Sequence, residues 1–387
     1  MTKKFEHLLD AARNLADRIF PLVDDIDKER ALPNEISNEI ADKNFFRLLV
    51  PKSLDGFELD FVNYLKILKV FAHIDGSTAW CVNQNNVFAT NSARMPKEIA
   101  HKIWNDKRAV VSNGPPDDSA SATMMEGGYS ISGRWNFSSG CRHSTWVAAL
   151  VPIHESCSHS DLSRKPQTHR TMLIPKKDVS LIDTWQVNGL RGTGSFSFEA
   201  TDLFVPNNHT FGPEDPPWNN NPLYHIPTVL LFASGFATVA LGLAYSGLRE
   251  AIKLSTIKTP GKTDTLLANT STTHRDIGKA EASWRAAQAF LDTSVISLWN
   301  TAISNQSLTP HQRIQLRLSS THAIRTSAHV IDVAYNLSGS NAIFTKNPIQ
   351  RRFQDIHAIT QQIQGRLTHY DTAGQFLLGL NTNKEMY

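Results

Sequence analysis

The sequence predicts a mainly α-helical protein with a small β domain at its centre, because the hydrophobic pattern changes period twice along the chain. Apolar residues recur at helical spacing over residues 1–105 and again over residues 216–387. Between them, residues 106–215 form short segments rich in β-branched and aromatic residues. A chain of 387 residues is long enough for several packed regions. We therefore expect an N-terminal helical domain, a small β-barrel or sandwich, and a C-terminal four-helix bundle with these boundaries.

The N-terminal region is predicted to be helical. Apolar residues between Phe5 and Ile19 share one face of an amphipathic helix, and the charges among them are not expected in a signal peptide. Pro33 can begin a second helix, and Pro51 lies beyond its end. A third helix is predicted by apolar residues that share one face: Phe61, Tyr64, Leu65, Leu68 and Phe71.

The central region reads as a series of short strands. Its segments include "YSISGRWNF", "TWVAALVPI" and "SFSFEATDLFVP", in which Phe196, Phe198 and Ala200 alternate with the period of a strand. Gly, Asn, Pro and Asp separate the segments, as is typical of turns. The polar stretch 154–170 lies between two of these strands, and we expect a solvated, mobile loop there.

The C-terminal region contains four segments of helical period, at 226–247, 276–303, 310–339 and 349–367. Short loops join them, which predicts an up-and-down bundle. The first segment has no charged residue over 22 positions, which is long enough to span a membrane. It also contains serine, threonine and glycine residues, and no second segment of this kind occurs in the chain. We therefore expect a helix buried in a large bundle and no membrane partner.

The composition narrows the classes of partner. The 39 basic and 36 acidic residues give a net charge of only +3 and are scattered, so no basic stripe suggests a nucleic-acid partner. Cys81, Cys141 and Cys157 are odd in number and lack the spacing of metal ligands. We expect neither a disulfide scaffold nor a metal site, and a reducing, cytoplasmic location.

Three stretches carry a family resemblance. They are "GRWNFSSGCRHSTW" at 133–146, "TWQVNGLRGTGSFSFEATDLFVP" at 184–206 and "NLSGSNAIFTKNPIQRRFQDIHA" at 336–358. Taken with the order of helices, strands and helices, they resemble the acyl-CoA dehydrogenase superfamily over essentially the whole chain. The resemblance implies the acyl-CoA dehydrogenase fold and a flavin cofactor.

One residue that the dehydrogenases need is missing. Acyl-CoA dehydrogenases remove the proton next to the thioester carbonyl with a glutamate, near the end of the bundle or on its central apolar helix. No glutamate occurs in residues 351–384 or in 223–249. The motifs "FSSG", "GLRGTGS" and "NPIQR" with a following Asp-x-His are instead similar to the oxygenase branch of the superfamily. That branch contains the two-component flavin-dependent monooxygenases, the group D hydroxylases.

The resemblance to this branch implies an oxygenase component that receives reduced FMN or FAD from a separate flavin reductase. Such an enzyme uses O2 to form a C4a-hydroperoxyflavin and hydroxylates a phenolic or indolic aromatic substrate. Three alternatives stay open at this point. They are N-oxygenation of an amine on the same fold, an acyl-CoA dehydrogenase with a displaced base, and a helical scaffold without a flavin.

The motif "FSSG" implies the residues at the flavin edge. Ser139 matches the hydroxyl residue that is set against flavin N5, Ser138 supports the turn or makes a second flavin contact, and Phe137 packs near the ring system. Two ordinary readings compete with these roles. A serine at a strand end often bonds the local backbone, and an aromatic residue on a strand is usually part of a core.

Further cofactor contacts are implied elsewhere in the chain. Arg191 in "GLRGTGS" offers a fork of donors to the flavin, or else the motif only fixes the β domain. Arg285 is a candidate for the flavin phosphate, or lies only on a helix surface. Gly339 and Ser340 in "LSGSN" match the segment that reaches the flavin of a neighbouring subunit, which implies a homotetramer.

The catalytic and substrate residues follow from the same resemblance. His357 lies near the place of the missing glutamate and is a candidate acid or base, because histidine titrates at about pH 6.5. The alternative is an ordinary core histidine. Related hydroxylases often carry another histidine shortly after, where this chain has Gln362, which is a further candidate to bind the substrate. Residues that would suit the walls of a planar-substrate pocket, or equally a domain interface, are Trp80, Asn83, Phe88, Tyr224 and His225.

Overall fold

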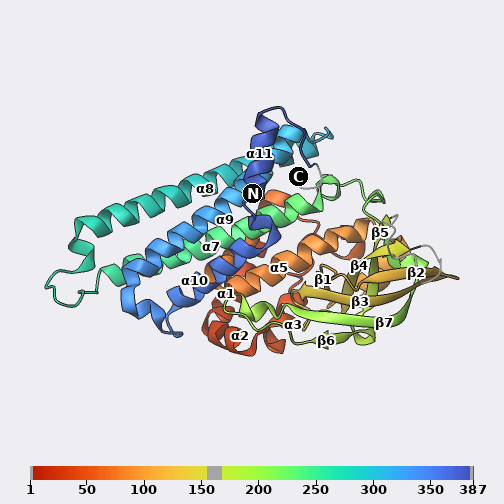
Figure 1. The fold of residues 1–387 in the computed structure, drawn as a ribbon, viewed down its shortest axis with the longest axis horizontal. Helices are drawn as coiled ribbons and strands as arrows, with labels where there is room; N and C mark the ends of the chain where they lie inside the picture. The colour runs from red at the N-terminus through yellow and green to blue at the C-terminus, as the bar shows by residue number, and fades with distance from the viewer. Residues whose placement is uncertain (1–2, 155–167, 384–386) are drawn as a thin grey trace.

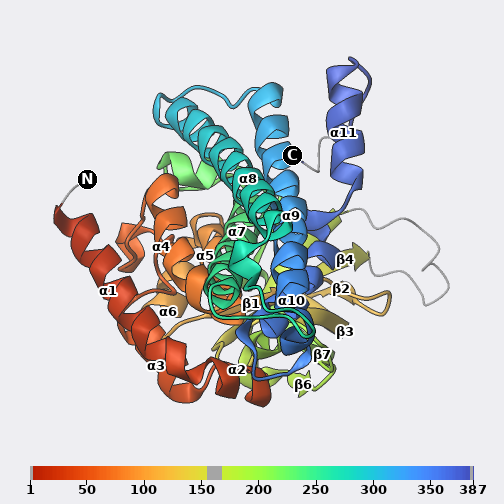
Figure 2. The same ribbon diagram turned by 90° about the vertical axis from the view of Figure 1, so that its left-hand side faces the viewer.

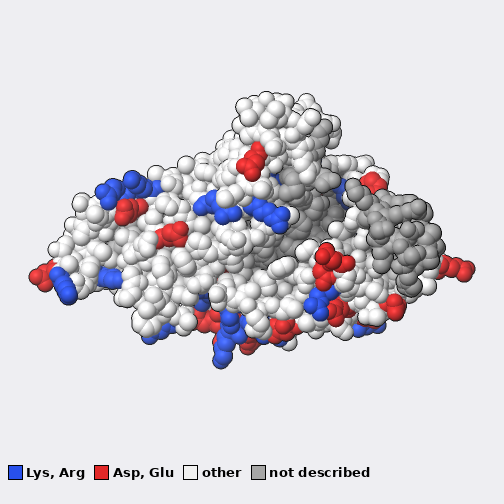
Figure 3. Space-filling model, in the orientation of Figure 1, with Lys and Arg blue, Asp and Glu red and all other residues white. Residues whose placement is uncertain are grey.

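The computed structural model describes residues 3–154, 168–383 and Tyr387. Long helices form one end of the elongated molecule and the strands form the other, with the N-terminal helices alongside both (Figure 1). Figure 2, which looks along the long axis, separates the N-terminal helices from the bundle. Basic and acidic side chains are interspersed on the face shown in Figure 3. The predicted fold class, mainly α with a central β region, is confirmed.

The N-terminal region contains α1 (Lys3–Ile19), α2 (Val23–Glu29), α3 (Asn34–Asp42), α4 (Phe61–Ile74), α5 (Gly76–Ala89) and α6 (Lys97–Trp104). Asp60 and Asp75 cap α4 and α5, because each carboxylate accepts a backbone N–H of the first turn. Helix α5 was not predicted as a separate element. It is buried on nearly every side, so its sequence has no polar face to mark it as an amphipathic helix.

The strands form one eight-stranded sheet in the described residues, in the order β6-β7-β3-β2-β4-β5-β8, with β1 paired to β4. Their bounds are β1 (Val111–Gly114), β2 (Ser121–Met125), β3 (Gly128–Ser138), β4 (Trp146–His154), β5 (Thr168–Pro175), β6 (Ser180–Ile182), β7 (Phe196–Pro206) and β8 (Thr210–Phe211). The loop predicted over 154–170 is shorter than expected, because its two ends belong to β4 and β5. Residues 155–167 of that loop, with Cys157, lie outside the described residues.

The C-terminal helices are α7 (Thr228–Ser255), α8 (Ser271–Ile303), α9 (Pro310–Ser338), α10 (Pro348–Gln361) and α11 (Thr368–Leu377). Helix α7 is long and apolar enough to cross a membrane, but 78% of its most apolar window is buried inside the protein. The buried bundle helix predicted at 226–247 is therefore confirmed. The last predicted segment, 349–367, is wrong at its end, because α10 stops at Gln361 and a short turn leads into α11.

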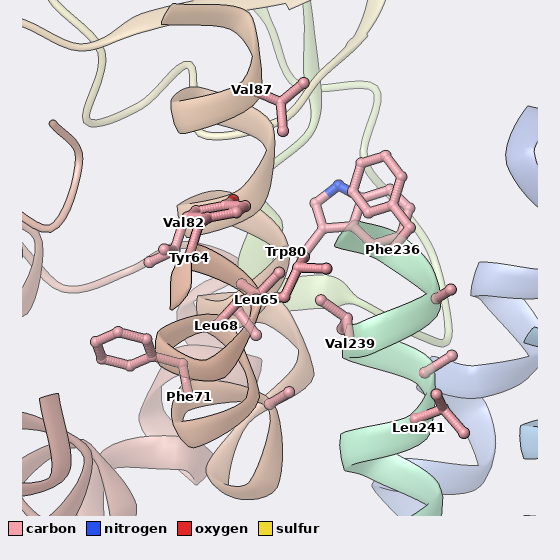
Figure 4. Close-up of a cluster of buried hydrophobic side chains, with 14 of the residues drawn as sticks. Tyr64, Leu65, Leu68, Phe71, Trp80, Val82, Val87, Phe236, Val239 and Leu241 are labelled. Atoms are coloured by element: carbon pink, nitrogen blue, oxygen red, sulfur yellow. The ribbon is translucent and has the colours of Figure 1, made fainter. Parts of the chain in front are cut away.

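Helix α5 brings the three regions together. It packs against α4 and α7 on one side and against β1 and the 191–193 turn on the other. Figure 4 shows α4, α5 and α7 side by side, with their apolar side chains directed toward one another. Polar groups of the strands that reach α5 therefore lie at the junction of the sheet and the bundle, and the candidate site lies at this junction.

Candidate active site

Stacked aromatic rings form one wall of the junction. The indole of Trp80 on α5 stacks on Phe236 of α7, with ring centroids 3.8 Å apart and an angle of 22° between the planes. Phe236 stacks in turn on Phe232, at 5.8 Å. Figure 4 shows the Trp80 and Phe236 rings in contact across the two helices. Large buried rings exclude water and leave the indole N–H in need of a partner.

That partner is the hydroxyl of Ser139, at the end of strand β3. Trp80 Nε1 donates to Ser139 Oγ at 3.0 Å, and Ser139 Oγ lies 2.7 Å from Ser195 Oγ. Ser195 Oγ lies 2.7 Å from Thr193 Oγ1, which donates to the carbonyl oxygen of Leu190 at 2.8 Å. We call Ser139, Ser195, Thr193 and the Leu190 carbonyl the hydroxyl chain. All three of its side chains are buried.

Ser138 belongs to a second, separate set of hydroxyls. Its Oγ contacts Ser112 Oγ at 3.2 Å, and Ser112 Oγ contacts Ser144 Oγ at 3.2 Å. Ser144 donates to the carbonyl oxygen of Cys141 at 3.0 Å. The two adjacent serines of "FSSG" thus point into different hydrogen-bond networks, and Ser138, which is fully buried, is in the position of a support for the turn.

Two residues beside the hydroxyl chain adopt strained backbone conformations. Phe137 has φ +56° and Leu190 has φ +53°, a region that residues with side chains rarely adopt. The strand pairing slips between Trp135 and Ser138, so Phe137 lies in a bulge, and its ring is 62% exposed. Its ring meets that of Trp185 edge to face, with the ring centroids 6.2 Å apart. Strain of about 1–3 kcal/mol per residue tends to occur at functional sites.

A buried carboxylate holds the strained Leu190 in place. Asp355 on α10 accepts the backbone N–H of Leu190 at 2.6 Å. Burial, and next the charge of Asp75, raise the pKa of Asp355 to about 7, although the Leu190 N–H and Arg351 act in the opposite direction. Asp355 therefore ties helix α10 to the loop that begins the hydroxyl chain.

Asn83 presents an unused donor close to Trp80. Its Oδ1 accepts the hydroxyl of Tyr64 at 3.0 Å, and its side chain packs tightly on Gly235 of α7. Its Nδ2 is buried and has no hydrogen-bond partner among the residues that the structure describes. An unpaired buried amide is costly, so Asn83 is suited to bind an acceptor atom of a ligand.

Cys141 and His143 both point into the protein. The Cys141 thiol donates to the Gly194 carbonyl at 3.3 Å, and burial raises its pKa to about 11. His143 stacks on Phe46 and lies 3.3 Å from Asn85 Oδ1. Burial, with the charge of Lys176, lowers the pKa of His143 to about 3. Both groups are uncharged near neutral pH and support the turn after Ser139.

His357 lies on a different face of α10. Its Nε2 pairs with Asp332 Oδ1 of α9 at 2.9 Å, and both side chains are about 40% exposed, 41% and 42% respectively. Two residues along a helix are about 200° apart, so His357 points away from the face on which Asp355 reaches the Leu190 loop. The structure does not bring His357 to Ser139, and its catalytic role stays a prediction.

Gln362 takes part in the tight turn between α10 and α11. Its Oε1 accepts the backbone N–H of Gln364 at 2.6 Å. The same turn is held from α9 by Arg317, which contacts Gln364 Oε1, and by Arg325, which donates to the carbonyl oxygen of Gly365. Gln362 thus shapes this turn, and a substrate contact from it stays a prediction.

The other predicted cofactor residues do not meet at the hydroxyl chain. Arg191 uses its donors on Asp27 and on the carbonyl of Val187. Arg285 is largely exposed on α8 and pairs with Glu281. Gly339 and Ser340 lie in the turn between α9 and α10, at the end of the bundle far from the strands (Figures 1 and 2).

The remaining predicted substrate residues are dispersed. Phe88 packs in the apolar cluster that includes α6, and Tyr224 donates its hydroxyl to the carbonyl of Leu49 at 3.2 Å. His225 lines a separate hollow of about 520 Å³ with Arg313. Of the residues proposed for a substrate pocket, Trp80 is thus hydrogen-bonded to Ser139, and Asn83 lies on the same helix, α5.

The junction fits the edge of a flavin ring. Ser139 offers a hydroxyl on a bulged strand end, beside the exposed ring of Phe137 and the buried Trp80. The predicted contacts Phe137, Ser138 and Ser139 therefore remain candidates to hold such a ring. In the part of the chain that the structure describes, no cluster of His, Cys, Asp and Glu could hold a metal ion.

The sequence did not single out Thr193 and Ser195. Both lie in "GLRGTGS", in which Arg191 was the residue predicted to contact the flavin. No periodic signal marked them, because Thr193 ends a short 3-10 turn and Gly194 is left-handed at φ +50°, so the turn and not strand alternation brings the two hydroxyls together. Asp355 and Phe236 were missed because nothing local marks them.

Comparisons with known proteins agree with this fold. The family model of the acyl-CoA dehydrogenase N-terminal domain matches residues 2–98, and that of the acyl-CoA dehydrogenase C-terminal domain matches residues 234–365. Indole-3-acetate monooxygenase of Pseudomonas putida is 28% identical over 97% of this chain and 93% of that protein.

Two further proteins are similar over nearly the whole length. The oxygenase subunit HsaA of a flavin-dependent monooxygenase from Mycobacterium tuberculosis is 25% identical, over 91% of this chain and 90% of that protein. The structure of XiaF from Streptomyces, in complex with FADH2 and glycerol, has a TM-score of 0.89 at 21% identity and covers 98% of this chain and 97% of that one. The chain therefore belongs to the acyl-CoA dehydrogenase superfamily, in its branch of flavin-dependent monooxygenases.

Proposed function

We propose that this protein is the oxygenase component of a two-component monooxygenase, which uses reduced flavin and O2 to hydroxylate an aromatic substrate. The observation that carries the proposal is the buried Ser139 hydroxyl, placed between a strained, exposed Phe137 and the stacked rings of Trp80 and Phe236. The names of the relatives support the same function, because they are monooxygenases and oxygenase subunits.

Three side chains of this protein would take part in the reaction: Ser139, Trp80 and Asn83. Reduced flavin, when bound, supplies the electrons that activate oxygen. Ser139 Oγ would hold the proton at flavin N5, and Trp80 with Phe236 would keep water from the junction. The unpaired Nδ2 of Asn83 would donate to a polar atom of the substrate. These roles require a dry site, which the burial of all four side chains supports.

The flavin is proposed to come from a separate reductase, as the class of the relatives implies. We further propose a cytoplasmic homotetramer. The support for the tetramer is the turn between α9 and α10, which contains Gly339 and Ser340 and lies at the end of the bundle away from the strands (Figure 1). A neighbouring subunit would then present this turn to the flavin.

Turnover with isotopically labelled O2 tests the proposal. The purified protein is supplied with a flavin reductase, NADH and either FMN or FAD, and with indole-3-acetate or simple phenols as candidate substrates. The proposal expects one labelled oxygen atom in the product. Anaerobic mixing with acyl-CoA thioesters is the control, and bleaching of oxidised flavin by a thioester would indicate a dehydrogenase instead.

A further inference from the structure

The hydroxyl chain has a fixed direction, which follows from counting protons. Four oxygen atoms lie in a row and are separated by three gaps of hydrogen-bond length. The oxygen–oxygen distances are 2.7 Å from Ser139 to Ser195, 2.7 Å from Ser195 to Thr193, and 2.8 Å from Thr193 to the Leu190 carbonyl. Two oxygen atoms at such distances need one proton between them. Each hydroxyl carries one proton and the carbonyl carries none, so three protons must fill three gaps.

The Leu190 carbonyl fixes which oxygen atom donates in each hydrogen bond of the chain. Leu190 O can only accept, and it also accepts Trp185 Nε1 at 3.1 Å, so the Thr193 proton must lie in the last gap. Thr193 then has no proton left for Ser195, and Ser195 must donate to Thr193. By the same step Ser139 must donate to Ser195. The polarity of the whole chain is therefore set by one backbone carbonyl.

The Ser139 hydroxyl has no proton left to donate to a ligand. Its proton is directed to Ser195, and one of its two lone pairs accepts the N–H of Trp80 at 3.0 Å. The second lone pair is its remaining hydrogen-bonding capacity. Two side chains keep this arrangement on either side of Leu190: Asp355 accepts the Leu190 N–H, and the partly buried Trp185 donates to the Leu190 carbonyl. Ser139 thus faces the junction as an acceptor.

We infer that Thr193 and Ser195 are positioning residues that make the site select reduced over oxidised flavin. Flavin N5 carries a hydrogen in the reduced ring and is a bare acceptor in the oxidised ring. An accepting Ser139 would bind the first and would repel the second, since two acceptors in contact share no proton. The inference rests on the proposed function, and it concerns residues that orient the Ser139 hydroxyl, Ser195 directly and Thr193 through Ser195, and not residues that touch the flavin.

Anaerobic titration of reduced and oxidised FMN measures this selectivity directly. The ratio of the two dissociation constants is compared among the wild-type protein, Ser195→Ala and Thr193→Val, with Thr193→Ser as the conservative variant. In Ser195→Ala the Ser139 proton is released and can be donated to the oxidised ring. We expect the preference of the wild type for reduced FMN to fall about tenfold, a shift of about 30 mV in the potential of bound FMN.

Ser197→Ala is the matched control. Ser197 is as buried as Ser195 and lies two residues away, but its hydroxyl bonds Thr184 and Asn136. The inference expects Thr193→Val to lower the preference, and both Thr193→Ser and Ser197→Ala to leave it within about twofold of the wild type. An unchanged preference in Ser195→Ala and Thr193→Val overturns the inference, as does a wild type that binds both forms equally. A wild type that binds neither form of FMN, and neither form of FAD in the same titration, contradicts the proposed function itself.

Discussion

The surroundings of Ser139 and of His357 differ in how completely the fold determines them. Every hydrogen bond of the Ser139 hydroxyl is made to a buried group, and those groups are held by a strained backbone and by Asp355. His357 has Asp332 as a partner on a half-exposed surface between α9 and α10. Preorganised chemistry needs fixed groups in a dry environment, so the comparison favours the strand end over the helix surface as the centre of catalysis.

Ser139→Ala should give the largest effect. The variant removes the acceptor proposed to hold the proton at N5, so the O2 that the bound reduced flavin consumes should be released as hydrogen peroxide instead of entering the product. Losing one preorganised hydrogen-bonding group costs about a hundredfold in comparable sites, and we expect the yield of product per O2 to fall by about that factor. Product and peroxide are measured together under single turnover. A yield close to that of Ser197→Ala would contradict the role of Ser139.

Asp355→Asn should change stability in a pH-dependent way. The folded-state pKa of about 7 is above the ordinary value of 3.8, so the folded protein binds the proton more tightly than the unfolded chain. The contribution of Asp355 to the free energy of unfolding should therefore fall as the pH rises from about 4 to about 7. Asparagine keeps the acceptor for Leu190 but carries no charge, and we expect it to stabilise the protein by about 2 kcal/mol at pH 8 and hardly at pH 4.

Denaturant titrations at both pH values measure this effect. Asp332→Asn is the matched control on the half-exposed face, and it should change the free energy of unfolding by less than about 1 kcal/mol. A difference in the free energy of unfolding between Asp355→Asn and the wild type that does not grow from pH 4 to pH 8 would contradict the assigned environment of Asp355.

Trp80→Phe should have a moderate effect on the same reaction. The ring stack on Phe236 is kept in large part, and only the N–H that donates to Ser139 is lost. A single hydrogen bond contributes about 1 kcal/mol, so the product yield per O2 should fall about fivefold. Circular dichroism and flavin titration check that the variant remains folded and binds flavin. A loss as large as that of Ser139→Ala would mean that Trp80 acts by more than this bond.

His357→Ala should give the smallest effect. An exposed ion pair contributes about 0.2–1 kcal/mol, and the geometry gives His357 no path to the hydroxyl chain. We expect product formation within about threefold of the wild type and a slightly lower thermal midpoint. Loss of product by a hundredfold, with flavin binding retained, would restore the acid–base role predicted from the resemblance.

The sequence predicted the architecture well because periodicity depends on local patterns. The change from helical to strand spacing near 105 and 215 and the buried helix at 226–247 could be read directly from the order of apolar residues. Helix α5 was not predicted, because it is buried on nearly every side and its sequence has no polar face. Helix α11 was not predicted, because it is short and follows a turn that is stabilised by side chains of the distant helix α9.

The candidate site could be predicted only in part. Ser139 was identified because the motif "FSSG" is local. Its partner Ser195 was not identified, and Trp80 was named only as a pocket wall, because both come from distant segments that meet Ser139 only in the folded chain. His357 shows the opposite case. It occupies a suggestive place in the sequence, but helix geometry turns it about 200° from the buried face of Asp355.

Rapid mixing of the anaerobic complex of this protein and reduced FMN with O2 tests the central claim most directly. A site that holds the N5 proton through Ser139 predicts that oxygen is consumed in a first phase and that oxidised flavin returns in a separate, slower phase. In Ser139→Ala the two phases should merge. A single phase in the wild type, with hydrogen peroxide formed in proportion to the flavin, would contradict the account.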